Sequence, residues 1–174
     1  GHPVTKPDLK PAFNGDAAFL LIAAFPALFA LAKYALWDIY GIFDFHTFHL
    51  AGALVNAGQV GQIYQPAYFM SQFEQFYGQS GTLPWFYPPV LLPYCQFLAL
   101  FPVSLAYLVN SFFSIAIYYL VIFRIFPKHY RDIIVLSALP LILPLGFGHP
   151  IILLLSLLFV GYRLAKSRLW KALL

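Results

Sequence analysis

The sequence of 174 residues contains very little charge. Only 9% of its residues are Asp, Glu, Lys or Arg, whereas 61% are hydrophobic, and the mean hydropathy is +0.78. Soluble domains carry about 25% charged residues, so six acidic and ten basic side chains are too few to cover a water-soluble globule of 19.7 kDa. Disorder is excluded as well, because disordered chains combine low hydrophobicity with high charge. The composition therefore predicts an integral membrane protein.

Cysteines and evenly spread basic residues are also lacking. The single cysteine, Cys95, cannot form an internal disulfide, and no CxxC, zincin, phosphate-loop or nucleophile-elbow motif occurs. The net charge is +4, but no Lys or Arg occurs between Lys33 and Arg124. The other bases lie near the start of the chain or at the ends of apolar runs, which is typical of membrane proteins. We therefore expect no cofactor and no nucleic-acid partner.

Apolar runs make up most of the chain and predict an all-α, polytopic protein with four or five transmembrane helices, at about 20 residues per span. An N-terminal tail, residues 1–16, precedes the first run at 17–36, and another long run covers 103–123. Residues 17–174 are interpreted as a single membrane domain. Shorter runs, interrupted by prolines and glycines, follow at 86–101, 133–147 and 151–162.

The segment 38–84 lacks Lys and Arg altogether and instead holds acidic residues, glutamines and tyrosines. Basic loops are retained in the cytoplasm, so a long loop without bases is expected on the extracytoplasmic side. Within this segment, residues 46–57 and 68–77 carry apolar side chains at helical spacing. We expect two short helices there that lie in the membrane interface.

Two topologies are compatible with these runs. If residues 86–101 and 103–123 both cross the membrane and the N-terminus is inside, the basic segment 124–131 is outside, as is the basic tail. If residues 86–101 are re-entrant or interfacial, both basic segments are cytoplasmic and His149 faces outside. Hydrophobicity favours the first topology and charge favours the second, so the sequence leaves both open.

The densest group of chemically active side chains is Asp44, His46 and His49, just after the first span. As a metal site, the two histidines would share a helix face with Asp44 nearby, but no third and fourth ligands are evident. As a catalytic site, Asp44 would act as a general base on an acceptor hydroxyl, with the histidines orienting it or binding phosphate. As a structural element, Asp44 would cap an interfacial helix. The residues alone leave these interpretations open.

Four further residues are candidates for substrate binding. Lys33 either snorkels to the interface or holds a lipid phosphate. Tyr64 and Tyr87 offer hydroxyl groups beside flat rings, as sugar-binding sites and interfacial aromatic belts both do. His149 stands between a glycine and a proline at a helix break, where exposed backbone lines a cavity or the protein interior.

Taken in order along the chain, these features resemble the first part of a polytopic glycosyltransferase with the GT-C fold, and most closely the polyprenyl-phosphate-dependent family 87. That family begins with one span, followed by an Asp, a small-residue helix ending in Gly, a Leu/Ile-Tyr pair, an aromatic-Tyr-Pro-Pro step and a later Gly-Gln. The similarity runs from about residue 17 to the end. The corresponding residues are Asp44-Phe45, the helix 50–58, Ile63-Tyr64, Phe86-Tyr87-Pro88-Pro89 and Gly148-His149.

The resemblance implies transfer of a sugar from a polyprenyl-phosphate donor to an extracytoplasmic acceptor in a bacterial inner membrane. Asp44 would be the general base, and Lys33 with the loop histidines would stabilise the departing phosphate. The expected partners are membrane lipids and the lipid-linked sugar. Members of the family are considerably longer, so the chain is either a piece of such a transferase or a short descendant that serves as a non-catalytic subunit of a larger membrane complex. A pigment- or haem-associated role of His46, His49 or His149 is a third hypothesis.

Overall fold

The computed structural model describes residues 15–36, 43–78 and 83–173, and every structural statement concerns these ranges. The described chain is all-helical and contains no strand, as the sequence predicts. Two short 3-10 turns, Val60–Gln62 and Pro89–Leu91, accompany the α-helices. The α-helices are α1 (Gly15–Ala35), α2 (Phe43–Asn56), α3 (Pro66–Tyr77), α4 (Leu92–Leu98), α5 (Val103–Ile125), α6 (Tyr130–Ala138), α7 (Ile142–Gly146) and α8 (Ile151–Leu173).

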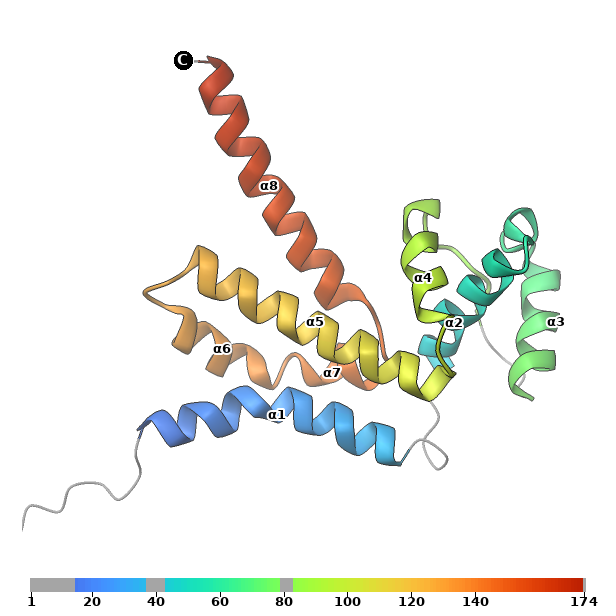
Figure 1. Ribbon diagram of the computed structural model, residues 1–174, viewed down its shortest axis with the longest axis horizontal. Helices are drawn as coiled ribbons and strands as arrows, with labels where there is room; N and C mark the ends of the chain where they lie inside the picture. The colour runs from blue at the N-terminus through green and yellow to red at the C-terminus, as the bar shows by residue number, and fades with distance from the viewer. Residues whose placement is uncertain (1–14, 37–42, 79–82, 174) are drawn as a thin grey trace, which may run out of the picture.

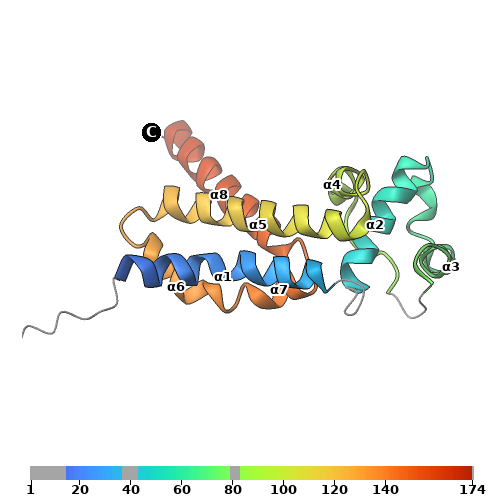
Figure 2. The ribbon, with the colours of Figure 1, turned by 60° about the horizontal axis from the view of Figure 1, so that its bottom comes forward.

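The helices form an elongated bundle with a separate group of helices at one end (Figure 1). Helix α1 packs against α5, α6 and α7 along the bundle, and α8 packs against α5 and then diverges from it. Helices α2, α3 and α4 gather beyond the end of the bundle at which α1 finishes and α5 begins (Figure 2). We call α2, α3 and α4 with their connections (residues 43–78 and 83–98) the α2–α4 unit, and this end of the bundle the site end.

Helices α1 and α5 are long and apolar enough to cross a membrane. They have 21 and 23 residues and mean hydropathies of 2.0 and 1.9, and at 1.5 Å per residue each reaches roughly the 30 Å of a hydrocarbon core. Many of their apolar side chains point outward: Leu20 and Leu21 of α1 are 65% and 62% exposed. A core helix of a soluble protein would bury such residues, so the exposed face of α1 is consistent with membrane association.

The apolar segment 86–101 forms no continuous helix. The 3-10 turn Pro89–Leu91 leads into the seven-residue helix α4, which lies against α2 rather than along the bundle. The contact is close at Gly52, where a Cβ atom would overlap the carbonyl oxygen of Cys95. The chain therefore stays at the site end between α2 and α5, because the prolines of this segment interrupt the helix.

The two short helices predicted for the segment 38–84 are present. Helix α2 begins at Phe43 and thereby includes Asp44 in its first turn instead of leaving it as the N-cap. Helix α3 runs from Pro66 to Tyr77 and is followed by Gly78, whose φ of 65° suits a glycine C-cap. Both helices contribute to a common aromatic core, so α2 is buried more deeply than an interfacial helix would be. That core includes Phe48, Leu54, Phe69, Phe73 and Trp85.

The opposite end of the bundle joins the first residues of α1 and α6 to the last residues of α5. Arg131 forms an ion pair with Asp16 there, and the rings of Phe19 and Tyr130 meet edge to face at 6.2 Å. The stacked rings of Phe126 and Phe159, 6.0 Å apart, bring the middle of α8 to the same end. We call it the basic end, because it carries Arg124, Lys128 and Arg131.

Candidate functional site

Three segments that are far apart in the sequence meet at the site end. Tyr87 precedes α4 and His149 precedes α8, and the Tyr87 hydroxyl lies 2.9 Å from Nε2 of His149. Asp44, in the first turn of α2, is exposed and lies near enough for its charge to act on both groups: burial raises the pKa of Tyr87 and lowers that of His149, and Asp44 adds to the first effect and opposes the second. These three residues, which we call the Asp44–Tyr87–His149 cluster, were each predicted as site residues, and the structure brings them together.

The turn that carries His149 is held against α2 by a glycine. Gly148 has a φ of 65°, and a Cβ atom there would lie 2.6 Å from Cβ of Phe45. Only glycine combines this backbone conformation with so close an approach. Gly148 thus places His149 beside the first turn of α2.

A buried polar pair on the opposite side fixes the same turn. The Asn110 side-chain amide, 1% exposed in the first half of α5, donates to the carbonyl of Gly148 at 3.2 Å. The Tyr94 hydroxyl donates in turn to Oδ1 of Asn110 at 2.8 Å. Sequence reasoning did not include Asn110 or Tyr94 among the site residues, although an asparagine inside an apolar helix is the signal that could have identified the first.

Tyr87 is positioned from two directions. Its backbone carbonyl accepts a hydrogen bond from the Tyr64 hydroxyl at 3.2 Å. Its ring packs against Phe48 and Trp85, with centroids 4.7 and 5.0 Å away. Tyr64, itself 43% exposed, therefore supports the backbone of the site and leaves its own ring open at the surface.

His49 and His46 form a second polar group around Tyr77. The Nε2 atom of His49 lies 2.9 Å from the carbonyl oxygen of Phe101, and its Nδ1 lies 2.8 Å from the Tyr77 hydroxyl. Because a carbonyl only accepts, Nε2 carries the proton and Nδ1 accepts from Tyr77. The ring of buried His46 meets that of Tyr77 at 4.4 Å. Tyr77 was not predicted as a site residue, and nothing in the sequence relates it to either histidine.

This second group argues against a metal site at the histidines. Both ring nitrogens of His49 are already engaged in hydrogen bonds. Within the described ranges, no three His, Cys, Asp or Glu side chains are grouped as metal ligands would be. Burial lowers the pKa of His49, opposed by its bond to Phe101, and thus favours the neutral ring. The arrangement favours a structural role for His49, which joins α2 to the end of α3 and to the start of α5.

Burial favours the neutral forms of two members of the cluster, Tyr87 and His149. Burial lowers the pKa of His149, and the nearby carboxylate of Asp44 partly opposes that effect. Burial and the same carboxylate raise the pKa of Tyr87. The Nδ1 atom of His149 is buried and makes no hydrogen bond within the described residues. An exposed carboxylate beside a neutral Tyr–His pair can accept a proton while the pair offers hydrogen bonds to a polar ligand.

The remaining predicted residue, Lys33, lies half-buried in the last turn of α1. That turn is at the site end, where the bundle meets the α2–α4 unit (Figure 2). The connection from α1 to α2, residues 37–42, lies outside the described part of the chain. Lys33 therefore lies at the same end of the molecule as the Asp44–Tyr87–His149 cluster.

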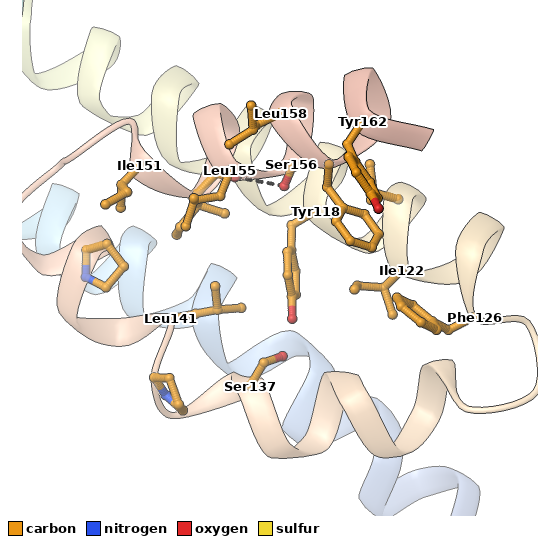
Figure 3. A pocket seen from close by; sticks show the side chains of 15 residues that line it. Tyr118, Ile122, Phe126, Ser137, Leu141, Ile151, Leu155, Ser156, Leu158 and Tyr162 are labelled. Atoms are coloured by element: carbon orange, nitrogen blue, oxygen red, sulfur yellow. Dashed lines mark hydrogen bonds between the residues drawn. The ribbon is translucent and has the colours of Figure 1, made fainter. Parts of the chain in front are cut away.

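A large apolar groove, which the sequence did not indicate, lies away from this site. It has a volume of about 860 Å³ and is bounded by α5, by α6 and α7, and by α8 (Figure 3). Its side chains come from Tyr118 and Ile122 of α5, Leu141 between α6 and α7, and Leu155 and Tyr162 of α8. The groove exists because α8 diverges from α5 and leaves their facing apolar surfaces uncovered.

Comparisons with protein-family models, curated proteins and solved structures found no match to this chain.

Proposed function

We propose that this protein is a membrane glycosyltransferase module that transfers a sugar from a polyprenyl-phosphate donor to an extracytoplasmic acceptor. The observation that carries the proposal is the convergence of Asp44, Tyr87 and His149 at one end of the bundle. The order of motifs along the chain, which resembles family 87 of the GT-C glycosyltransferases, supplies the reaction.

The distribution of charge supports an orientation for this module. Arg124, Lys128 and Arg131 lie at the basic end, and α8 runs toward that end before it reaches Arg163 and Lys166. The positive-inside rule puts these residues in the cytoplasm and the site end outside. In this orientation α1, α5, the interrupted pair α6–α7 and α8 make four crossings. The segment 86–101 remains on the outer side, as the second of the two topologies requires.

In the proposed reaction, the carboxylate of Asp44 takes the proton of an acceptor hydroxyl. The acceptor oxygen forms a bond to the anomeric carbon of the sugar, while the bond from that carbon to the donor phosphate oxygen breaks. The phosphate leaves with the bonding electrons and its negative charge, which the ammonium group of Lys33 stabilises. Tyr87 and His149 hold hydroxyl groups of the sugar through hydrogen bonds. No metal ion or cofactor is required by this scheme.

The test replaces Asp44 with Asn in the full-length protein, in membranes supplied with a polyprenyl-phosphate sugar. Transfer of labelled sugar should fall at least about 100-fold, which is the usual contribution of a general base. Glu74→Gln, which neutralises an exposed carboxylate on α3 in the same unit, is the matched control and should keep full activity. Equal activity of the Asp44→Asn variant and the parent would contradict the assignment.

A second candidate is a non-catalytic subunit of a larger membrane complex. The observation that favours it is the amount of apolar surface left uncovered, namely the outward leucines of α1 and the groove beside α8. Copurification from native membranes in fixed stoichiometry with other membrane proteins, without bound polyprenyl phosphate, would support this role. An absorption spectrum of the same preparation tests the pigment- or haem-associated hypothesis.

A further inference from the structure

The apolar groove between α5 and α8 is suited to a hydrocarbon chain. Its volume of about 860 Å³ is within the range of ligand-binding pockets. The two serines in its lining are already satisfied, because Ser156 donates to the carbonyl of Ile152 and Ser137 to that of Ile134, each within its own helix. The remaining lining is aliphatic and aromatic, and its only polar side-chain groups are the hydroxyls of two tyrosines (Figure 3). An occupant of this groove gains mainly by removing apolar surface from its surroundings.

The face of α8 that lines the groove continues into a basic surface. Leu155, Phe159 and Tyr162 line the groove at helical spacing. Arg163 follows Phe159 by four residues and Lys166 follows Tyr162 by four, so both lie on the same face of α8 one turn farther on. Both side chains are exposed.

The facing side of the groove also ends in a basic residue. Phe126, which lines the groove and stacks on Phe159, precedes the exposed Lys128 by two positions. The two described acidic residues of the basic end are directed elsewhere. Asp16 pairs with Arg131, and Asp132 lines a separate depression between α1 and α6. The opening of the groove at this end is therefore basic.

We propose that the groove binds an acyl chain of an anionic phospholipid, with the phosphate held at Arg163, Lys166 and Lys128. The apolar groove complements the acyl chain of such a lipid, and the cationic side chains at its end complement the phosphate at the membrane surface. A second copy of the chain is a poorer occupant, because a symmetric contact through the groove would bring the Arg163 and Lys166 residues of two molecules together. The proposed phosphate contacts lie at the basic end, opposite Asp44, and take no part in the proposed sugar transfer.

The test measures lipid binding to the full-length protein in detergent by native mass spectrometry. Phosphatidylglycerol and phosphatidylcholine with the same acyl chains are the probes. We expect at least about a tenfold preference for phosphatidylglycerol, since each basic residue at a membrane surface contributes roughly a factor of five. The double variant Arg163→Gln/Lys166→Gln, which changes only exposed side chains, should reduce this preference to the roughly fivefold that Lys128 alone would give. Equal binding of both lipids by the parent protein, or an unchanged preference in the double variant, would overturn the proposal.

A second variant tests the groove itself. Leu155→Trp places a large ring where the acyl chain would lie. The binding of phosphatidylglycerol to this variant should fall to the level at which the parent protein binds phosphatidylcholine. Leu157→Trp is the matched control, because Leu157 is 52% exposed on α8 and does not line the groove; it should bind lipid as the parent does. A dimer that forms through the groove and is lost in Leu155→Trp alone would identify a second copy as the occupant and overturn the proposal.

Discussion

The two ends of the helical bundle differ in whether their polar and charged side chains are buried or exposed. At the site end, polar groups are largely buried and connected to one another, as in the contacts of His49 with Tyr77 and of Asn110 with Gly148. At the basic end, the charged side chains are exposed, and the ion pair of Arg131 with Asp16 lies at the surface. The site end is thus specified by polar contacts that have to be satisfied, whereas the basic end is tolerant of change.

The physical reason is the cost of desolvation. A buried polar group without a partner loses about 1–3 kcal/mol, so the hydrogen bonds of His49, Asn110 and Tyr94 at the site end fix the positions of groups on other segments. Exposed ion pairs are screened by water and contribute little. A precise arrangement of side chains is therefore expected only at the site end, and substitutions should reveal the difference.

The largest effect is expected where two segments of the site end approach most closely. Gly52→Val would drive a side chain into the backbone of α4 at Cys95 and separate α4 from α2. We expect a loss of about 3 kcal/mol in stability, as for severe overpacking, seen as a lower midpoint of thermal unfolding in detergent. Gly61→Val, at an open position, is the control. Equal midpoints for the two variants would show that α2 and α4 do not pack as described.

A smaller effect is expected from a single hydrogen bond. Tyr77→Phe removes the hydroxyl that donates to Nδ1 of His49 and should cost about 1 kcal/mol. At the other end, Arg131→Gln removes the exposed pair with Asp16 and should leave the unfolding midpoint unchanged. If Arg131→Gln lowered the unfolding midpoint more than Tyr77→Phe does, the stated difference between the two ends would be contradicted.

The most gradual effect is expected from pH. Burial lowers the folded-state pKa of His49 and of His149 below the ordinary 6.5. The unfolded chain then binds protons at a higher pH than the folded one, so stability is constant above about pH 7.5 and decreases as the pH falls through 6.5. Unfolding midpoints between pH 8 and 5.5 measure this slope. The double variant His49→Gln/His149→Gln should flatten it, and an unchanged slope would assign the effect to other groups.

The sequence predicted several features of the fold because they depend on composition and local spacing. The helical class and the two long apolar helices follow from unbroken runs of apolar residues, and the observed bounds differ from the predicted ones by at most two residues. The two short helices of the segment 38–84 follow from helical spacing in the same way.

Other features depended on contacts between distant segments. The sequence could suggest Asp44, Tyr87 and His149 one by one, from residue type and from resemblance, but it contained no measure of their separation in space. Similarly, local hydrophobicity alone would allow residues 86–101 to form one continuous helix, and only the tertiary structure shows a short α4 packed on α2 instead.

By itself, the sequence determined that this is a helical and strongly apolar protein. Apart from Lys33, its basic residues lie near the start of the chain or at the ends of apolar runs. These properties depend only on which residues are present and how they are spaced. The tertiary structure decided that Gly148 and Asn110 hold His149 beside Tyr87, with Asp44 close by. It also decided that α8 diverges from α5 and leaves an apolar groove. Both outcomes depend on the packing of side chains between helices, which no local pattern specifies.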